Sequence, residues 1–252
     1  MSKYETKKIN DIVIKPFNKN ISSKRIIPFP LPDPQSQGIG KAFLMFVNSK
    51  INSGKSVLIS NLLNIYKGYF KRVYFCSSNI ETNDEGNKEI KDQAYKGVFK
   101  FNEERMFDDF NDQIMKNILD DIKECKDETD YDETDYFLLI VDDLSNSFTK
   151  LNTLITKSIL RLRHIGLCIW IISQRYKNIN PSIRSQISYF ITFRTENKME
   201  IEAMSQTIDK SFDEFKDLLN FATSEKYGFL FIDSTTNPAK FYKNLSNEII
   251  KK

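Results

Sequence analysis

Residues 42–56 read AFLMFVNSKINSGKS, and this stretch decides the fold. Residues 42–47 form an uninterrupted apolar run of strand length, which is typical of a strand buried on both faces. Residues 56–66 carry apolar side chains near the helical period, so they predict an amphipathic helix. Between the two lies a polar loop with a single glycine, Gly54. The pattern therefore predicts a strand, a tight loop and a helix in direct succession.

The loop of residues 49–56, SKINSGKS, predicts a binding site for phosphate groups. Backbone amides at the start of a helix attract anions, and Gly54 allows a phosphate to approach the backbone closely. Lys55 adds a positive charge for the β- and γ-phosphates, and Ser56 offers a hydroxyl to Mg²⁺. The phosphate-loop pattern G-x-x-x-x-G-K-[ST] begins with glycine, where this chain has Ser49; we expect a stiffer backbone but no lost phosphate ligand. The predicted nucleotide contacts are Ser49, Asn52, Ser53, Gly54, Lys55, Ser56 and Val57.

Residues 137–143, FLLIVDD, predict a buried strand that ends in two carboxylates. Buried charges are costly unless they are paired or bind a cation. We expect Asp142 to hold the hydration shell of Mg²⁺ and Asp143 to orient and polarise the attacking water, a role in which glutamate is commoner. The alternative is a strand-ending turn in which an aspartate caps a helix.

A strand at residues 72–76 and a crossover helix separate the two motifs. That layout favours P-loop NTPases of the RecA-like, additional-strand subclass, in which another strand lies beside the phosphate-loop strand. Further expected strands lie at residues 136–141, 167–172, 188–193 and 227–232, and further helices at residues 103–124, 150–164 and 198–221, with a polar loop at residues 77–102. Strands that alternate with helices indicate an α/β fold with a mainly parallel sheet flanked by helices.

Residues 167–174, LCIWIISQ, place polar groups at the carboxyl end of a buried strand, where ligands of open α/β sheets bind. We expect Gln174 to hydrogen-bond the γ-phosphate or the attacking water; the alternative is a polar strand end without a role. Arg163, Arg175, Lys177 and Arg184 are candidates for a cation that acts on a neighbouring subunit's γ-phosphate. Arg184, in the segment NPSIRSQ, is the preferred one.

Two basic segments allow contacts with a partner. Residues 1–41 hold eight Lys or Arg against three Asp or Glu, and prolines recur at positions 28, 30, 32 and 34. We therefore expect a basic, proline-rich arm at residues 1–40 and an ATPase domain at residues 41–252. The predicted helix at residues 150–164 carries a stripe of Lys150, Lys157, Arg161 and His164. Each segment is either solvated or in contact with nucleic acid or another subunit.

Composition excludes several other classes of protein. A chain of 252 residues with 40% hydrophobic residues fills one large domain, and its net charge of +3 permits a polyanionic partner without requiring one. The three widely spaced cysteines predict free thiols in a reducing compartment. A single histidine argues against zinc sites and a Ser-His-Asp triad. No segment resembles a signal peptide or a membrane span, so we expect a protein that is neither secreted nor inserted in a membrane.

Three stretches together resemble a known family: INSGKS, LLIVDDL and RLRHIGLCIWIISQRYKNINPSIRSQISYFITFR. They are similar to the DNA-packaging ATPases of poxviruses, other large DNA viruses and virophages, within the FtsK/HerA superfamily. The resemblance covers about residues 41–195. It implies that Lys55 and Ser56 bind phosphate and Mg²⁺, that Asp142 and Asp143 serve metal and water, and that Gln174 is the sensor.

The resemblance also implies partners and a place of action. The expected cofactors are ATP and Mg²⁺, and the expected partners are double-stranded DNA, further copies of the chain in a ring, and capsid proteins. The place of action would be the host cytoplasm or viral factory, including association with the virion.

Other functions fit the same motifs. A helicase or secretion-type ATPase of the same superfamily would act on another polymer. A nucleotide-switched assembly factor would bind ATP and barely hydrolyse it, an idea that Ser49 and Asp143 motivate. A small-molecule kinase is less well supported, because no lid or acceptor-pocket motif is visible.

Overall fold

The computed structural model describes residues 3–13, 27–35, 41–50, 52–78, 105–150 and 153–251. Along the chain its elements are β1 (Tyr4–Lys8), β2 (Leu44–Asn48), α1 (Lys55–Ile65), β3 (Arg72–Ser77), β4 (Met106–Phe107), α3 (Asp112–Lys126), β5 (Phe137–Asp142), η2 (Ser145–Phe148), α4 (Leu154–Leu160), α5 (Leu162–Ile165), β6 (Leu167–Ser173), η3 (Tyr176–Asn178), α6 (Pro181–Arg184), β7 (Ile187–Phe193), α7 (Lys198–Thr207), α8 (Phe212–Ala222), β8 (Phe229–Asp233), β9 (Lys240–Lys243) and β10 (Asn247–Lys251). Most of the predicted loop at residues 77–102 lies outside the described residues.

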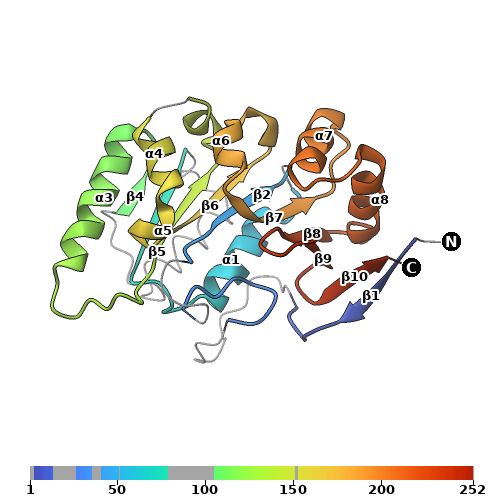
Figure 1. The fold of residues 1–252 in the computed structure, drawn as a ribbon, viewed down its shortest axis with the longest axis horizontal. Helices are drawn as coiled ribbons and strands as arrows, with labels where there is room; N and C mark the ends of the chain where they lie inside the picture. Colours follow the sequence, from blue (N-terminus) through green and yellow to red (C-terminus); the bar gives the residue numbers. More distant parts are fainter. Residues whose placement is uncertain are drawn as a thin grey trace.

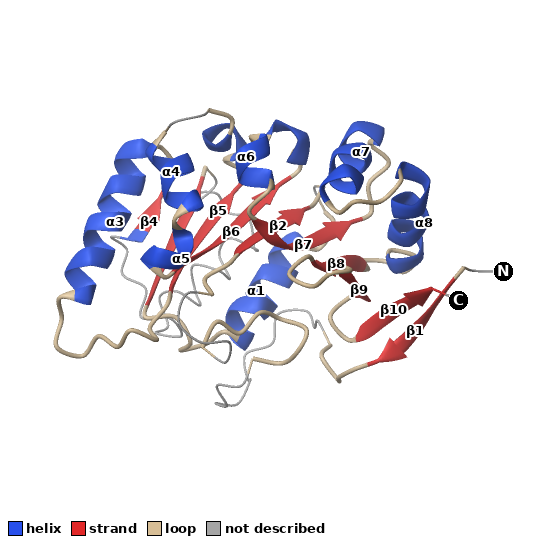
Figure 2. Ribbon diagram, in the orientation of Figure 1, coloured by secondary structure: helices blue, strands red, loops and turns tan. Residues whose placement is uncertain are grey.

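One ten-stranded sheet runs through the molecule in the order β1-β10-β9-β8-β7-β2-β6-β5-β3-β4 (Figure 2). The strands from β7 to β4 pair in parallel, as the sequence predicts. The other four strands continue the sheet with antiparallel pairs, and of these only β8 is expected from the sequence. The α/β prediction is thus confirmed, with an antiparallel extension at one edge.

The central strands are buried on both faces because helices cover both sides of the sheet. Every residue of β2, β5 and β6 is buried. On one face Tyr66, just after α1, packs edge-on against Trp170 of β6, with ring centroids 5.6 Å apart. On the opposite face Tyr176 of η3 packs against Phe46 of β2 at 4.9 Å. Figure 1 shows α1 on one side and α4, α6 and α7 on the other.

Strand β6 lies between the two motif-bearing strands, β2 and β5. Asn48 at the end of β2 is in register with Ser173 at the end of β6, and Ile172 is in register with Asp142 at the end of β5. The carboxyl ends of the three strands therefore meet at one edge of the sheet. This is the additional-strand layout, and β6 is the strand inserted between the two.

The three longer helices expected after residue 100 differ from the structure in their boundaries. Residues 106–107 form the edge strand β4, and α3 begins only after Asn111, whose side chain accepts hydrogen bonds from the amides of Gln113 and Ile114. The predicted helix at 150–164 is divided at Arg161 into α4 and α5. The one at 198–221 is divided into α7 and α8, because Ser211 caps a new helix. Apolar periodicity continued through each boundary and so concealed the capping residues Asn111 and Ser211, whereas α5 begins at the Arg161 break without a side-chain cap.

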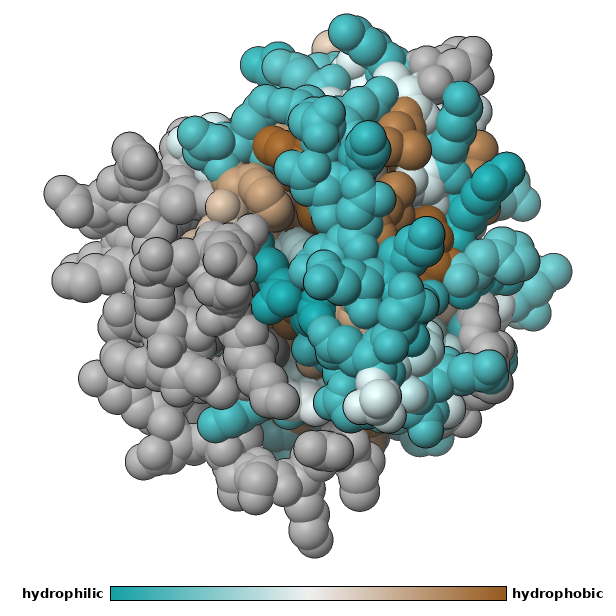
Figure 3. Space-filling view, turned by 90° about the vertical axis from the view of Figure 1, so that its left-hand side faces the viewer, coloured by the Kyte–Doolittle hydropathy of each residue, from teal (hydrophilic) through white to brown (hydrophobic). Residues whose placement is uncertain are grey.

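The outer surface of α3 is solvated. Its exposed side chains are polar or charged, including Lys116, Asp120, Lys123 and Glu124, whereas Met115, Ile118 and Ile122 are buried. Among the coloured residues in Figure 3, this side of the molecule is mostly hydrophilic, with smaller hydrophobic areas between. An amphipathic helix of this kind covers the sheet without needing a partner.

The described parts of the predicted arm are packed onto the domain. Residues 4–8 form β1, which pairs along its whole length with β10. In the proline-rich stretch, Ile27 and Leu31 are buried, and the hydroxyl of Tyr66 donates a hydrogen bond to the carbonyl of Pro32 at 2.6 Å. These described parts therefore pack against the domain, residues 14–26 and 36–40 lie outside the described residues, and the division of the chain at residue 40 stays a prediction. The strand was missed because β1, YETKK, has the polar composition of a solvated edge strand.

Within the described part of the chain, no helix combines the length and the apolar character that crossing a membrane would require.

Candidate nucleotide-binding site

The loop between β2 and α1 has the backbone shape of an anion-binding turn. Gly54 precedes α1 with φ 95° and ψ 11°, in the left-handed region that glycine adopts without strain. Asn52 also has a positive φ, 61°, which asparagine tolerates better than most residues. Helix α1 therefore begins at Lys55, directly after the tight turn that follows β2.

The start of α1 lacks the side-chain cap that α3, α4, α7 and α8 possess. Asn111, Thr153, Asn197 and Ser211 each accept a hydrogen bond from the first-turn amides of α3, α4, α7 and α8. At α1 no side chain does so, and no acidic residue lies in the first turn. An 11-residue helix with uncapped amides and no carboxylate of its own suits an external anion such as phosphate.

Lys55, Asp142 and Asp143 meet at this edge of the sheet. The Lys55 ammonium lies 2.8 Å from Oδ1 of Asp142 and 3.0 Å from Oδ2 of Asp143. Burial by itself lowers the pKa of Lys55, but the two carboxylates outweigh it and raise that pKa above its ordinary value. The two motifs, far apart in the sequence, therefore form one site.

Asp143 owes its position to a turn at the end of β5. Its φ is 57°, and its amide donates a hydrogen bond to the carbonyl of Ile172 at 2.9 Å. The residue before η2 is Leu144, and no side chain caps that short helix. The alternative interpretation, in which an aspartate caps a helix, is therefore wrong. Asp143 is directed at Lys55 instead.

Ser49 fits the position where the phosphate-loop pattern has glycine. It is buried, its amide donates to the carbonyl of Ser173 at 3.3 Å, and its backbone lies outside the left-handed region. The hydroxyls of Ser49 and Ser53 are both buried and have no hydrogen-bond partner among the described residues. Unpartnered buried hydroxyls are costly, so the loop holds polar groups that its own protein contacts leave unsatisfied.

With this geometry established, comparisons with known proteins identify the family. The model of the family described as Poxvirus A32 protein matches residues 36–236. The chain belongs to the poxvirus A32 protein family. A comparison with curated protein sequences finds no significant match.

Solved structures share the fold of this A32-family protein. The genome packaging NTPase B204 of Sulfolobus turreted icosahedral virus 2, in complex with ATP-gammaS, aligns with a TM-score of 0.58 and 18% identity over 81% of this chain and 98% of that chain. The same protein with AMP aligns at 0.57 and 21%, covering 80% and 96%. B204, described as the DNA-packaging ATPase of Sulfolobus turreted icosahedral virus, aligns at 0.57 and 17%, covering 79% and 96%. At these identities the likeness shows the fold, a P-loop NTPase domain.

Gln174 of the A32-family protein lies at the carboxyl edge of the sheet, the same edge as Lys55 and Asp142. It directly follows Ser173, the last residue of β6 and the register partner of Asn48, and it is exposed. In the described chain its side chain makes no hydrogen bond. The Ser173 hydroxyl instead accepts a hydrogen bond from the amide of Arg175 at 3.1 Å. The role of Gln174 as a sensor stays a prediction.

Arg184 is not brought to this phosphate loop. Its guanidinium carbon lies 5.6 Å from the ring centroid of Tyr176, and its buried Nε has no hydrogen-bond partner among the described residues. The next strand begins at Ile187, in register with Leu44 at the far end of β2. Action on a neighbouring subunit's nucleotide stays a prediction for this residue.

Two structural contacts at the site were not expected from the sequence. The buried Asn48 amide donates to the hydroxyl of Thr192 at 3.3 Å and so joins the ends of β2 and β7. The buried carboxylate of Glu200 accepts a hydrogen bond from the amide of Lys177 at 3.0 Å, which ties α7 to the segment after Gln174. Neither residue lies in a recognisable motif, and only the strand order brings their partners close.

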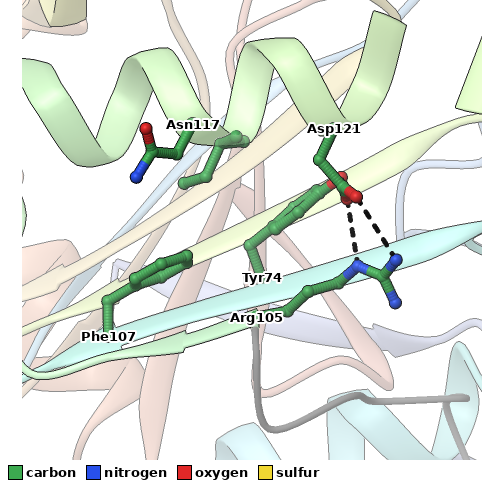
Figure 4. A pocket seen from close by; sticks show the side chains of 6 residues that line it. Tyr74, Arg105, Phe107, Asn117 and Asp121 are labelled. Carbon is green, nitrogen blue, oxygen red and sulfur yellow. Dashed lines mark hydrogen bonds and ion pairs between the residues drawn. The ribbon is translucent and has the colours of Figure 1, made fainter. Parts of the chain in front are cut away.

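A separate cavity of about 140 Å³ lies between α3 and the strands β3 and β4, of which β4 is the edge strand of the sheet (Figure 4). Tyr74, Arg105, Phe107, Asn117 and Asp121 are among the residues that line it. Arg105 and Asp121 form an ion pair at 3.0 Å, and the Tyr74 hydroxyl donates to the same carboxylate at 2.5 Å. Its charged groups thus satisfy each other, and the cavity is distinct from the phosphate loop.

Proposed function

We propose that this protein is an ATP-hydrolysing motor that translocates double-stranded DNA, in the packaging of a genome into a viral capsid. The observation that carries the proposal is the meeting of Lys55 with Asp142 and Asp143 beside the uncapped start of α1. Membership of the A32 family and the fold shared with B204, a viral genome packaging NTPase, support the same function.

Each residue of the site has a defined task in this proposal. The amides of residues 53–56 and the ammonium of Lys55 bind the phosphates. Ser56 and Asp142 are oxygen donors that suit Mg²⁺, which takes one or two carboxylates together with phosphates and water, and the ion neutralises charge that develops on the phosphates. Asp143 holds and polarises the attacking water, and Gln174 contacts the γ-phosphate or that water.

Nucleotide binding requires Lys55 to change partners. In the present structure its ammonium bonds only to carboxylates among the described residues. Phosphate oxygens compete for the same ammonium, and its transfer to them frees Asp143 for the water. Positioning and charge stabilisation then provide most of the catalysis that phosphoryl transfer needs.

DNA contact is assigned to exposed basic side chains. Lys157, Arg161 and Arg163, on and beside α4 and α5, are exposed, and none forms an ion pair within the described chain. Free cations of this kind suit phosphate backbones in a manner that is independent of base sequence and weakened by salt. The proposal further includes a ring of identical subunits, an arginine supplied in trans, contact with capsid proteins, and action in the host cytoplasm or viral factory.

The test measures phosphate release with and without double-stranded DNA across a salt series, while light scattering follows the oligomer. We expect DNA to stimulate release at low salt, and Lys55→Ala to abolish it. Lys71→Ala is a matched control, because Lys71 has the same 21% exposure and also contacts two aspartates, Asp130 and Asp135.

Two results would contradict the motor. A rate of phosphate release that DNA does not change at any salt concentration would indicate that the motor acts on a different polymer. Tight ATP binding without phosphate release, unchanged in Asp143→Asn, would indicate a nucleotide-switched assembly factor.

A further inference from the structure

An exposed aromatic ring lies directly beside the phosphate loop. Tyr227 is 58% exposed, although it is a large and partly apolar side chain. A Cβ atom built on Gly54 would lie 3.3 Å from Cδ1 of Tyr227 and 3.6 Å from its Cβ and Cγ. The ring therefore contacts the residue that opens the phosphate-binding helix, while most of its surface faces solvent.

The sheet register explains how a residue so late in the chain reaches this place. Asn48 at the end of β2 pairs with Thr192 of β7, and Thr192 pairs with Leu230 of β8. Since β8 runs antiparallel to β7, its first residues lie at the same edge as the end of β2. The loop from α8 into β8 consequently ends beside the phosphate loop, and Tyr227 is its last residue but one.

The backbone of this loop is held in an unusual shape. Tyr227 has φ 63°, a left-handed conformation that bulky residues rarely adopt. The turn around it is fixed: the Gly228 amide donates to the carbonyl of Glu225 at 3.0 Å, and Lys243 bonds the Glu225 carboxylate at 2.7 Å. Glycine or asparagine would relieve the strain at position 227. An aromatic residue kept there at a conformational cost, and not used in the core, points to a role for the ring.

We propose that Tyr227 is the stacking platform for the base of the bound nucleotide. The inference rests on the proposed function, because it assumes phosphates on the amides of α1. A nucleotide anchored there extends its base away from Lys55, and an aromatic face at the rim of the loop offers the base an apolar contact. The ammonium of Lys226, an exposed residue, lies over the Tyr227 ring, 5.0 Å from its centroid.

Stacking through a π-face distinguishes poorly between bases. The platform therefore predicts that ATP and GTP bind with similar affinity, and that affinity depends on the ring rather than on the Tyr227 hydroxyl. The phosphate contacts should be independent of it, since they belong to the backbone and to Lys55.

The experiment compares two ligands by calorimetry: ATPγS with Mg²⁺, and inorganic tripolyphosphate with Mg²⁺, which lacks a base. We expect Tyr227→Ala to weaken ATPγS binding by about 10- to 100-fold and to leave tripolyphosphate binding unchanged. Tyr227→Phe keeps the ring and should restore ATPγS binding to within about threefold of the original chain.

Tyr131→Ala is the matched control. Tyr131 also has a lysine ammonium near its ring, Lys126 at 5.7 Å, but it stacks on Phe137 at the start of β5, away from the phosphate loop. This variant should bind both ligands normally. Thermal melting of each variant checks that the fold is retained.

Each other outcome overturns the inference in a recognisable way. Equal losses for ATPγS and tripolyphosphate in Tyr227→Ala would mean that the ring supports Gly54 rather than the base. If Tyr227→Ala loses affinity for neither ligand, the base binds elsewhere. If the original chain binds neither ligand, the proposed function fails as well, whereas normal binding without DNA-stimulated turnover removes only the motor.

Discussion

The substitution Lys55→Ala tests the geometry of the site in the absence of any ligand. It removes the ammonium that lies between two carboxylates, and the side chain of Asp142 is only 6% exposed. Breaking a fully buried ion pair costs about 3–5 kcal/mol, and an exposed pair contributes about 0–1 kcal/mol. Lys55 is 21% exposed and Asp143 29% exposed. We therefore expect the free energy of unfolding to fall by about 2–3 kcal/mol, or roughly 5–10 °C in Tm.

Urea unfolding of nucleotide-free protein measures this loss, with Lys71→Ala beside it. Lys71 lies 3.0 Å from Asp130 and 3.5 Å from Asp135, but Asp130 is 71% exposed. Solvent screening should limit its loss to under about 1 kcal/mol. Equal losses for the two variants, or a more stable Lys55→Ala, would refute a paired ammonium at the site.

The pH dependence has a definite sign. Although burial lowers the pKa of Lys55, the carboxylates raise it overall above the ordinary 10.5. A group with a raised folded-state pKa contributes its full stability below its unfolded pKa and loses it as the pH rises through the folded one. The stability difference between the original chain and Lys55→Ala should thus be level from about pH 7 to pH 9 and shrink only above about 10.5. A difference that shrinks near neutral pH would contradict the assignment.

Three further predictions concern Asp143, the cap of α3 and the three cysteines. Asp143→Asn should slow phosphate release by about 100-fold or more while ATPγS affinity, measured by calorimetry, stays within about threefold. Asn111→Ala removes the cap of α3 and should lower the free energy of unfolding by about 1 kcal/mol, measured in urea. Burial raises the pKa of Cys168 to about 12 and also raises that of Cys76 and Cys125, so a thiol reagent at about pH 8 should label the unfolded chain and spare the folded one.

Local signals made the nucleotide site predictable. The apolar runs of β2 and β5 and the polar residues that follow them lie within short segments, and parallel strands bring such strand ends to one edge. The meeting of Lys55 with Asp142 and Asp143 follows from these features. Burial on both faces is what makes such strands visible, because it leaves continuous apolar runs in the sequence.

Pairing between distant and polar segments could not be predicted in this way. Strand β1, YETKK, gains its place from backbone hydrogen bonds to β10, near the other end of the chain, and four of its five residues are exposed. The sequence predicts Tyr227 as the first residue of a strand, but β8 begins at Phe229, and the order β2-β7-β8 places Tyr227, in the preceding loop, beside Gly54. Its proposed role depends on the strand register and on a positive φ, and neither property can be predicted from apolar periodicity.

The proposed function also explains why nucleotide affinity would not follow from the phosphate contacts alone. In that proposal one ammonium has two sets of partners: Lys55 bonds to Asp142 and Asp143 in this structure, and to phosphate when nucleotide binds. Its transfer leaves two adjacent carboxylates without their cation, and like charges at that distance disfavour each other. In the proposed function, Asp142 and Ser56 would hold Mg²⁺, whose positive charge would offset this repulsion. The affinity is therefore a difference between two sets of contacts, and base stacking on Tyr227 adds to only one of them.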